Sequence, residues 1–210
     1  LTSDGSGDVT IDNANTDIVL IASEIGGNLT LTTGNASGII DNGTVTVGGN
    51  LVATTDDNNG VINLDSMAVD GTFTLSPHST GAVTVVNDAG LDLAASTMGG
   101  TFSGTATTGN ITDTGALAIT GTTTLVTSAN DATITLNNTS NAFTGAMTIT
   151  TNDASGTDAD VTIDGGTTAL NIGASTIDGD LTVTSDNASG IIDSGTVTVG
   201  GNLIATTDGN

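Results

Sequence analysis

Apolar and hydroxyl-bearing residues alternate along several short segments of the chain. The pattern reads Thr-Val-Thr-Val at 44–47, Val-Thr-Val-Val at 83–86 and Thr-Ile-Thr-Leu at 133–136. Alternation with a period of two, carried by β-branched residues, is typical of β-strands that bury one face. Turn-forming pairs such as Asn42-Gly43 and Asp70-Gly71 separate the segments. No helical stripe accompanies them, and the strong helix formers Glu, Gln, Lys and Arg are represented by Glu24 alone. The pattern therefore predicts an all-β protein.

A short motif opens many of these segments: a glycine, a polar residue, an apolar residue, and then the alternation. Its glycines are Gly27, Gly49, Gly71, Gly100, Gly121, Gly145, Gly179 and Gly201. Successive glycines are 22, 22, 29, 21, 24, 34 and 22 residues apart, so the commonest interval is 22. Internal repeats of this length indicate a repeat architecture. We interpret the intervals of 29 and 34 as containing loop insertions or one degenerate copy.

A longer repeat contains the short one. Residues 8–58 recur as residues 160–210, an offset of 152, and 34 of the 51 overlaid positions are identical. Because 152 is close to seven times 22, the long repeat holds about seven short ones. Residues 1–210 are therefore expected to form one continuous repetitive segment, a window on a longer chain.

Two or three short strands in each 22-residue unit describe one coil of a β-solenoid, which buries its apolar face only by stacking on its neighbours. We predict an all-β parallel β-solenoid (a β-helix) with coils of about 22 residues. Parallel strands about 4.8 Å apart would give a rod on the order of 45 Å long. The apolar motif residues are expected to form a single inward column: Leu29, Leu51, Phe73, Phe102, Met147, Leu181 and Leu203.

Tandem β-sandwich domains are the alternative architecture, because strands spaced by 8–12 residues also suit a sandwich. A period of about 22 residues is too short for a sandwich domain. No segment has the composition of a linker. Both observations favour the solenoid.

The charge of the chain restricts its partners. It has no Lys or Arg and 23 acidic residues, which gives a net charge of −23. Nucleic acids and anionic membrane surfaces are excluded as partners, because both are bound through basic side chains. No apolar run is long enough for membrane insertion. There is no Cys, so neither a disulfide nor a thiolate metal site can form.

The repeated text Gly-Asn-Leu-Thr-Leu-Thr at 27–32 and Gly-Thr-Val-Thr-Val-Gly-Gly-Asn-Leu at 43–51 resembles the strand repeats of large bacterial surface proteins. It is similar to the repeats of the filamentous-haemagglutinin-like adhesins, and the resemblance covers essentially the whole chain. It implies a right-handed parallel β-helix, export to the cell surface, and a role as a stalk, fibre or adhesin. The absence of Lys and Arg departs from most members of that family.

Residues with catalytic chemistry are few. His78 is the only imidazole and lies beside the only proline, in Ser-Pro-His-Ser at 76–79, which reads as a loop. No Cys and no serine motif accompany it, so a nucleophilic triad is not supported. Paired carboxylates could hydrolyse glycosides, but no basic residue is present to hold an acidic polysaccharide. We expect no enzymatic activity and no required cofactor.

Calcium is the metal that the turns could bind. Asp56 and Asp57 begin the run Asp-Asp-Asn-Asn-Gly. Asp158 and Asp160 flank Ala159, a few residues after Asn152-Asp153. Oxygen ligands on turns suit a hard cation. Asn and Asp are also favoured in turns for backbone reasons alone. Specific calcium sites at Asp56, Asp57, Asp158 and Asp160, loose screening by divalent cations, and ordinary solvated turns therefore all remain open.

These observations together favour a secreted structural protein at the cell surface, a fibre, stalk or sheath that associates with itself into fibres or sheets. An adhesin shaft whose binding tip lies outside this segment is the alternative. Recurring Thr-x-Thr pairs, such as Thr30 with Thr32 and Thr44 with Thr46, leave an ice-binding surface as a minor alternative. A calcium-bridged matrix protein is another.

Overall fold

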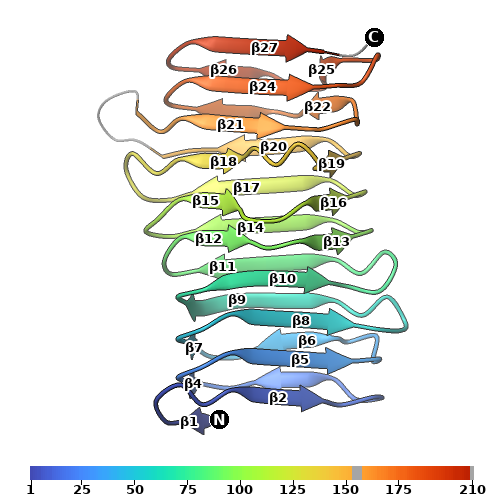
Figure 1. Cartoon of the computed structure of the whole chain (residues 1–210), viewed down its shortest axis with the longest axis vertical. Coiled ribbons are helices and arrows are strands. Elements are labelled where there is room, and N and C mark those ends of the chain that lie inside the picture. The colour runs from blue at the N-terminus through green and yellow to red at the C-terminus, as the bar shows by residue number, and fades with distance from the viewer. Residues whose placement is uncertain (153–157, 209–210) are drawn as a thin grey trace.

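The computed structural model, which describes residues 1–152 and 158–208, is a rod of stacked coils (Figure 1). The described residues form strands and turns and no helix. Strands that pair lie about one coil apart in the sequence, and they run parallel to each other, as in the pairs Val9–Leu29, Phe102–Thr123 and Leu181–Leu203. The predicted all-β parallel β-solenoid is confirmed, and the tandem sandwich is wrong because its strands would pair within a domain in antiparallel order.

One sheet of ten strands runs the length of the described rod. Its strands are β2 (Val9–Asp12), β5 (Leu29–Thr33), β8 (Leu51–Thr55), β10 (Thr72–Ser76), β12 (Leu91–Leu93), β15 (Ile111–Asp113), β18 (Ile134–Leu136), β21 (Val161–Asp164), β24 (Leu181–Ser185) and β27 (Leu203–Thr207).

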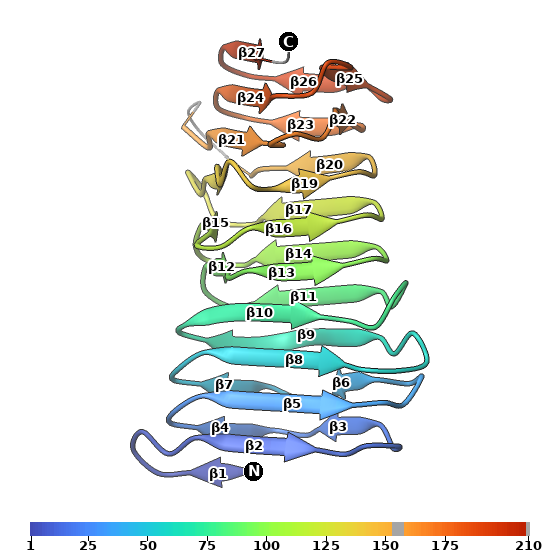
Figure 2. The same cartoon turned by 45° about the vertical axis from the view of Figure 1, so that its right-hand side comes forward.

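A second sheet of fourteen strands lies across the bore from the first (Figures 1 and 2). It contains β1 (Thr2–Ser3), β3 (Ile18–Leu20), β4 (Ser23–Ile25), β6 (Ile39–Asp41), β7 (Val45–Val47), β9 (Ile62–Val69), β11 (Val83–Asn87), β14 (Phe102–Ala106), β17 (Thr123–Thr127), β20 (Met147–Thr150), β22 (Leu170–Ile172), β23 (Ser175–Ile177), β25 (Ile191–Asp193) and β26 (Val197–Val199). A small sheet completes the described strands with β13 (Ser96–Met98), β16 (Leu117–Ile119) and β19 (Ala142–Phe143).

The register of the ten-stranded sheet gives the coil length. Val9 pairs with Leu29, Leu29 with Leu51, and Leu51 with Phe73, so the first coils advance by 20, 22 and 22 residues. The long repeat runs from β2 to β21, which is seven steps along this sheet. At about 4.8 Å a step, the nine steps from β2 to β27 span roughly 43 Å.

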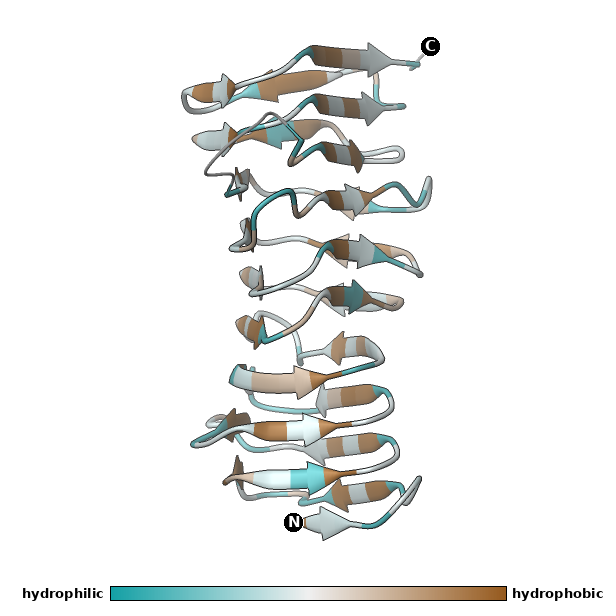
Figure 3. Cartoon of the chain, turned by 90° about the vertical axis from the view of Figure 1, so that its left-hand side faces the viewer, coloured by the Kyte–Doolittle hydropathy of each residue, from teal (hydrophilic) through white to brown (hydrophobic). Residues whose placement is uncertain are grey.

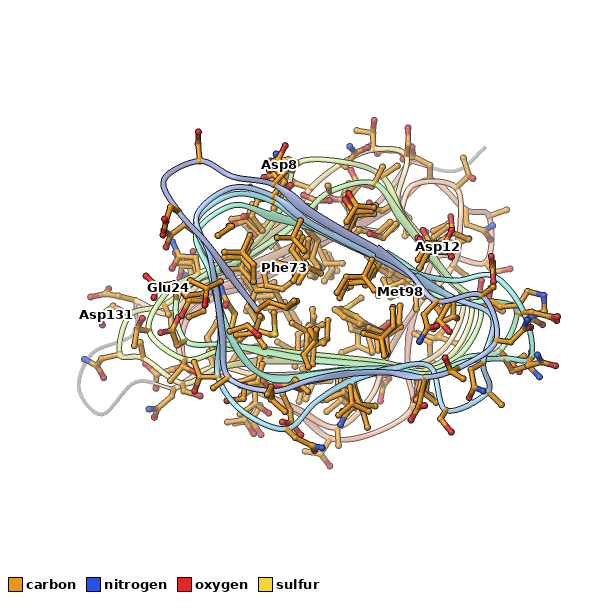
Figure 4. All side chains as sticks on the ribbon, turned by 90° about the horizontal axis from the view of Figure 1, so that it is seen from below. Asp8, Asp12, Glu24, Phe73, Met98 and Asp131 are labelled. Carbon is orange, nitrogen blue, oxygen red and sulfur yellow. The ribbon has the colours of Figure 1, made fainter. Side chains whose placement is uncertain are left out.

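The alternation seen in the sequence separates the bore from the surface. Inward residues such as Leu51 and Ala53 are fully buried, while Val52 and Thr54, which alternate with them, point outward. The hydropathy colouring shows the same banding along the strands (Figure 3). Seen along the rod, Phe73 and Met98 lie inside it, and Asp8, Asp12, Glu24 and Asp131 lie outside (Figure 4). The apolar side chains form one continuous buried cluster from Ile18 to Val183.

Each coil has one straight side and one bent side. In the early coils the straight side is a five-residue strand of the ten-stranded sheet, such as β5 or β8. The bent side is a pair of three-residue strands in the fourteen-stranded sheet, β3 with β4 or β6 with β7. In the middle coils the five-residue strands are β11, β14 and β17, which belong to the fourteen-stranded sheet.

The straight side changes sheet at two levels of the rod. The eight-residue strand β9 covers both β6 and β7 and is itself covered by the straight strand β11. One step later the straight strand β10 is covered by two short strands, β12 and β13. The reverse change occurs where β20 is covered by β22 and β23.

This exchange corrects the predicted single column. Leu29, Leu51 and Phe73 do stack in the ten-stranded sheet. Phe102 and Met147 stack instead in the fourteen-stranded sheet, aligned through Thr123. The motif marks the straight strand of each coil, and the straight strand changes sheet. The interval of 29 residues between Gly71 and Gly100 carries the motif from one sheet to the other, so it is neither a loop insertion nor a degenerate copy.

A buried serine stabilises each place where a bent pair covers a straight strand. Ser96 begins β13, directly after the kink that follows β12, and its Oγ accepts the Leu75 N–H of β10 at 2.9 Å. It also donates to the Ala94 carbonyl at 2.9 Å. Ser175 repeats the arrangement, accepting the Ile149 N–H of β20 at 3.0 Å. The hydroxyl replaces the strand-to-strand partner that the kink removes.

We expect Ser96→Ala to destabilise the protein by about 1–3 kcal/mol, because the buried Leu75 N–H would lose its acceptor. The urea midpoint of unfolding measures this. Ser103→Ala on β14, where the side chain points outward, is the matched control and should change the midpoint little. Equal effects of the two substitutions would contradict the role given to Ser96.

The corners between the two sides leave no room for side chains. A Cβ added to Gly121 would overlap the carbonyl group of Gly100 in the adjacent coil, and one added to Gly49 would come within 2.8 Å of the Gly27 carbonyl carbon. The Gly49 N–H donates to the Gly27 carbonyl at 3.0 Å, which holds the corners together. The motif glycines are therefore required by close stacking of the coils.

Gly121→Ala should destabilise the stack by about 1–3 kcal/mol, since the coils must move apart to admit the methyl group. Thr124→Ala, three residues along on an outward position of the same coil, serves as the control. Chemical unfolding of both variants would measure the effect. A Gly121 variant as stable as the control would show that the corner accommodates a methyl group without moving the coils apart.

Candidate functional site

The four predicted calcium ligands lie on two separate turns. Asp56 and Asp57 follow β8, and Asp158 and Asp160 precede β21. Five steps of the ten-stranded sheet separate β8 from β21, a distance of about 24 Å along the rod. The structure therefore does not bring the two pairs together, and each would have to bind a cation without the other.

The turn after β8 has a backbone reason for its composition. Asn58 and Asn59 have positive φ angles of 54° and 55°, which Asn tolerates better than most residues. The Asp57 carboxylate accepts the Asn58 N–H at 2.8 Å, and the Asn58 amide donates to the Gly34 carbonyl at 2.7 Å. Both carboxylates are exposed. Ligation by Asp56 and Asp57 stays a prediction.

Asp160 belongs to a ladder of side chains along one corner of the rod. Its Oδ1 accepts the Asp180 N–H at 2.7 Å, and the Asp180 Oδ1 accepts the Asn202 N–H at 2.6 Å. The same ladder runs near the other end, where Asp8 accepts from Asn28 at 2.7 Å and Asn28 from Asn50 at 2.8 Å. We call these residues the corner ladder. It gives Asp160 a structural role that the sequence did not suggest.

Asp158 is the remaining residue of the calcium prediction. Asp158 is exposed, and its carbonyl accepts the Asp160 N–H at 2.9 Å. Asp153, which was considered with it, lies outside the described residues. Among residues 1–152 and 158–208, no three His, Cys, Asp or Glu side chains are grouped so that they could hold a metal ion.

His78 lies in the turn after β10, close to the turn after β8. Its Nδ1 accepts the Asn59 N–H at 3.3 Å, and its own N–H donates to Thr55 Oγ1 at 2.8 Å. These bonds connect two successive turns. They place the single imidazole in a structural contact between coils.

Asp41 is the acidic residue with the most unusual surroundings. It ends β6 with its side chain directed inward, and it is 6% exposed. Its Oδ1 accepts the Asp65 N–H at 2.8 Å, while its Oδ2 is buried without a hydrogen-bond partner. Burial raises the pKa of Asp41, and the negative charge of Asp65 raises it further. The alternation of inward and outward residues that begins at the inward Ile39 predicts that Asp41 also points inward, so the sequence could have identified its burial.

The raised pKa of Asp41 predicts a particular dependence of stability on pH. The folded chain binds the proton more tightly than the unfolded chain, so Asp41 costs no stability at acidic pH and destabilises as the pH rises through its folded pKa. We expect Asp41→Asn to raise the melting temperature at pH 7 and to leave it nearly unchanged at pH 3. The amide keeps an oxygen for the Asp65 N–H.

Asp193→Asn is the matched control, because Asp193 is the equivalent residue 152 positions later and is exposed. Thermal unfolding followed by circular dichroism at both pH values measures the effect. Equal changes at pH 3 and pH 7 for Asp41→Asn would contradict a destabilising buried charge.

No helix in the described residues is long and apolar enough to cross a membrane. The comparisons with known proteins identify a repeat family. The family model described as "Repeats of unknown function (DUF5649)" matches residues 6–76, 80–150 and 158–210. No curated protein and no solved structure matches the chain. The matched copies begin 74 and 78 residues apart, so two of them fill the 152-residue repeat.

The three matched copies do not lie in the same orientation on the rod. The straight strands of the first copy, β5, β8 and β10, are in the ten-stranded sheet. Those of the second copy, β14, β17 and β20, are in the fourteen-stranded sheet, and those of the third, β24 and β27, are in the ten-stranded sheet again. Each copy therefore spans about three and a half coils, and successive copies are related by about half a turn.

Proposed function

Since the chain belongs to this family of repeats of unknown function, we propose its role from its architecture: it is the shaft of a secreted fibre, stalk or sheath at the cell surface. The observation that carries the proposal is the continuity of the stack. Both large sheets run along the described rod, and the buried apolar cluster is continuous from Ile18 to Val183. A rod of this kind transmits force along its axis through many parallel hydrogen bonds.

The distribution of polar groups supports a mechanical role. Hydrogen bonds between coils are made by the backbone, by the corner ladder and by the kink serines. The corner ladder occurs in the first and third family copies, and the kink serine occurs in the second and third. A catalytic site requires one place that differs from its repeats. The most unusual position, Asp41, has its counterpart Asp193 in the next long repeat. We accordingly propose no enzymatic activity.

The acidic coat supports a role for dissolved cations. With a net charge of −23 and no basic residue, neighbouring rods repel each other at low ionic strength. Divalent cations between the exposed carboxylates of adjacent rods would reduce that repulsion without a specific site. We propose this loose screening rather than a calcium-bridged matrix held by Asp56, Asp57, Asp158 and Asp160.

Electron microscopy of the native protein, with and without a calcium chelator, tests the proposal. We expect long uniform filaments that persist in the chelator, because the coil stack holds them together. A chain carrying Asn at positions 56, 57, 158 and 160 should form the same filaments. Dissolution in chelator together with failure of this variant to assemble would favour the calcium-bridged matrix. Isolated globular particles under both conditions would contradict the fibre.

A further inference from the structure

The outward side chains of the straight strands form two flat faces without charge. Face 1 consists of the outward residues of β5, β8 and β10, namely Thr30, Thr32, Val52, Thr54, Thr74 and Ser76. They stand in two columns, since Thr30 aligns with Val52 and Val52 with Thr74, while Thr32 aligns with Thr54 and Thr54 with Ser76.

Face 2 is the equivalent surface on the other sheet, made by the outward residues of β11, β14, β17 and β20. One column is Thr84, Ser103, Thr124 and Thr148. The second column is Val86, Thr105, Val126 and Thr150. The half turn between the first and second family copies places this same chemistry on the opposite side of the rod, further along its axis than face 1.

Charge is excluded from both faces although the chain has 23 acidic residues. Outward acidic side chains occur elsewhere on the strands. Glu24 on β4, Asp65 on β9 and Asp92 on β12 lie on bent sides. Asp12 on β2 and Asp164 on β21 lie in the ten-stranded sheet, where Asp12 aligns with Thr32 at the border of face 1 and Asp164 aligns with Thr184. The turns carry most of the others. Faces 1 and 2 are thus neutral patches on a strongly anionic rod, and Asp12 borders face 1.

We propose that faces 1 and 2 are lateral docking surfaces for further copies of this chain, so that rods pack side by side into a layer. This inference rests on the proposed fibre and names the surfaces by which its rods associate. Each rod has two such faces on opposite sides, so it accepts two neighbours.

The chemistry of the faces selects a second copy as the occupant. A hydroxyl both donates and accepts hydrogen bonds, so an array of Thr and Ser complements another array of the same kind. The hydroxyls of Thr32, Thr54 and Thr105 occupy outward positions of their strands, where a partner can reach them. A cationic partner would bind the acidic turns instead. A partner with the same negative charge can approach only where charge is absent.

The size of one face predicts weak association. Face 2, the larger, has four strands of four or five residues and covers roughly 19 by 16 Å, or about 300 Å². A stable interface buries about 800 Å² on each partner. A single pair of faces is therefore insufficient for a permanent dimer. Contacts repeated along longer rods add, because the second contact is made at the high effective concentration set by the first.

Sedimentation velocity of the chain over a range of concentrations in 10 mM and 1 M NaCl tests the proposal. High salt shortens the Debye length to about 3 Å and screens the acidic turns. The wild-type chain should then show a weight-average mass that rises with concentration beyond that of a dimer. In 10 mM NaCl it should remain a monomer.

Charged substitutions separate the two faces. Thr32→Asp with Ser76→Asp blocks face 1 and should limit association to dimers, because face 2 remains. Adding Thr84→Asp and Thr124→Asp blocks face 2 as well and should leave monomers. The control with matched charge is Thr46→Asp with Thr176→Asp, on exposed positions of the bent-side strands β7 and β23, and it should associate like the wild type.

Circular dichroism confirms that each variant is folded, and Gln at the same positions replaces any Asp variant that is not. Face variants that associate like the wild type, a control that dissociates as they do, or a wild-type chain that stays monomeric in 1 M NaCl would each overturn the proposal. Filaments one rod wide in micrographs of the face variants would show that the fibre survives without lateral docking. Absence of filaments from the wild type would instead contradict the proposed function.

Discussion

The structure depends on the backbone hydrogen bonds that join each coil to the next at a spacing of about 4.8 Å. The chain has no Lys or Arg, so its side chains supply no ion pairs with basic residues to supplement these bonds. Other features of the fold maintain this spacing between coils. Glycines fill the corners where a Cβ would strike the neighbouring coil, and Ser96 and Ser175 restore acceptors where a kink interrupts the ladder. The acidic side chains stay mostly on the outside, where water solvates them.

One sequence motif builds both sides of the rod. Residues 27–32 form a straight strand in the ten-stranded sheet, and the related residues after Gly100 and Gly121 form straight strands across the bore. This is feasible because a coil has the same parts wherever it begins: a five-residue strand, a corner, two short strands and a second corner. A repeat of three and a half coils therefore uses one set of local rules and reverses the orientation of each successive copy.

The sequence predicts the coil better than it predicts the relation between coils. Alternation at 44–47 identifies Val45 and Val47 as inward residues, and a 22-residue interval is enough to give parallel stacking. The sheet to which Phe102 belongs is not determined locally, because an interval of 29 residues reads equally well as a loop insertion. The composition of one turn is enough to suggest Asp56 and Asp57 as oxygen ligands. The hydrogen bonds of Asp160 and the burial of Asp41 instead depend on residues one coil away. Interactions between coils were thus the part that sequence inspection missed.

The half-turn relation between copies has a consequence for the shape of a long chain. A coil with a straight side and a bent side is asymmetric, so a stack of identical coils would favour bending toward one side. Reversing the asymmetry after every three and a half coils makes the bias of each copy oppose that of its neighbour. We expect any such curvature to cancel over one 152-residue period, so that the axis of a chain with many periods would stay straight.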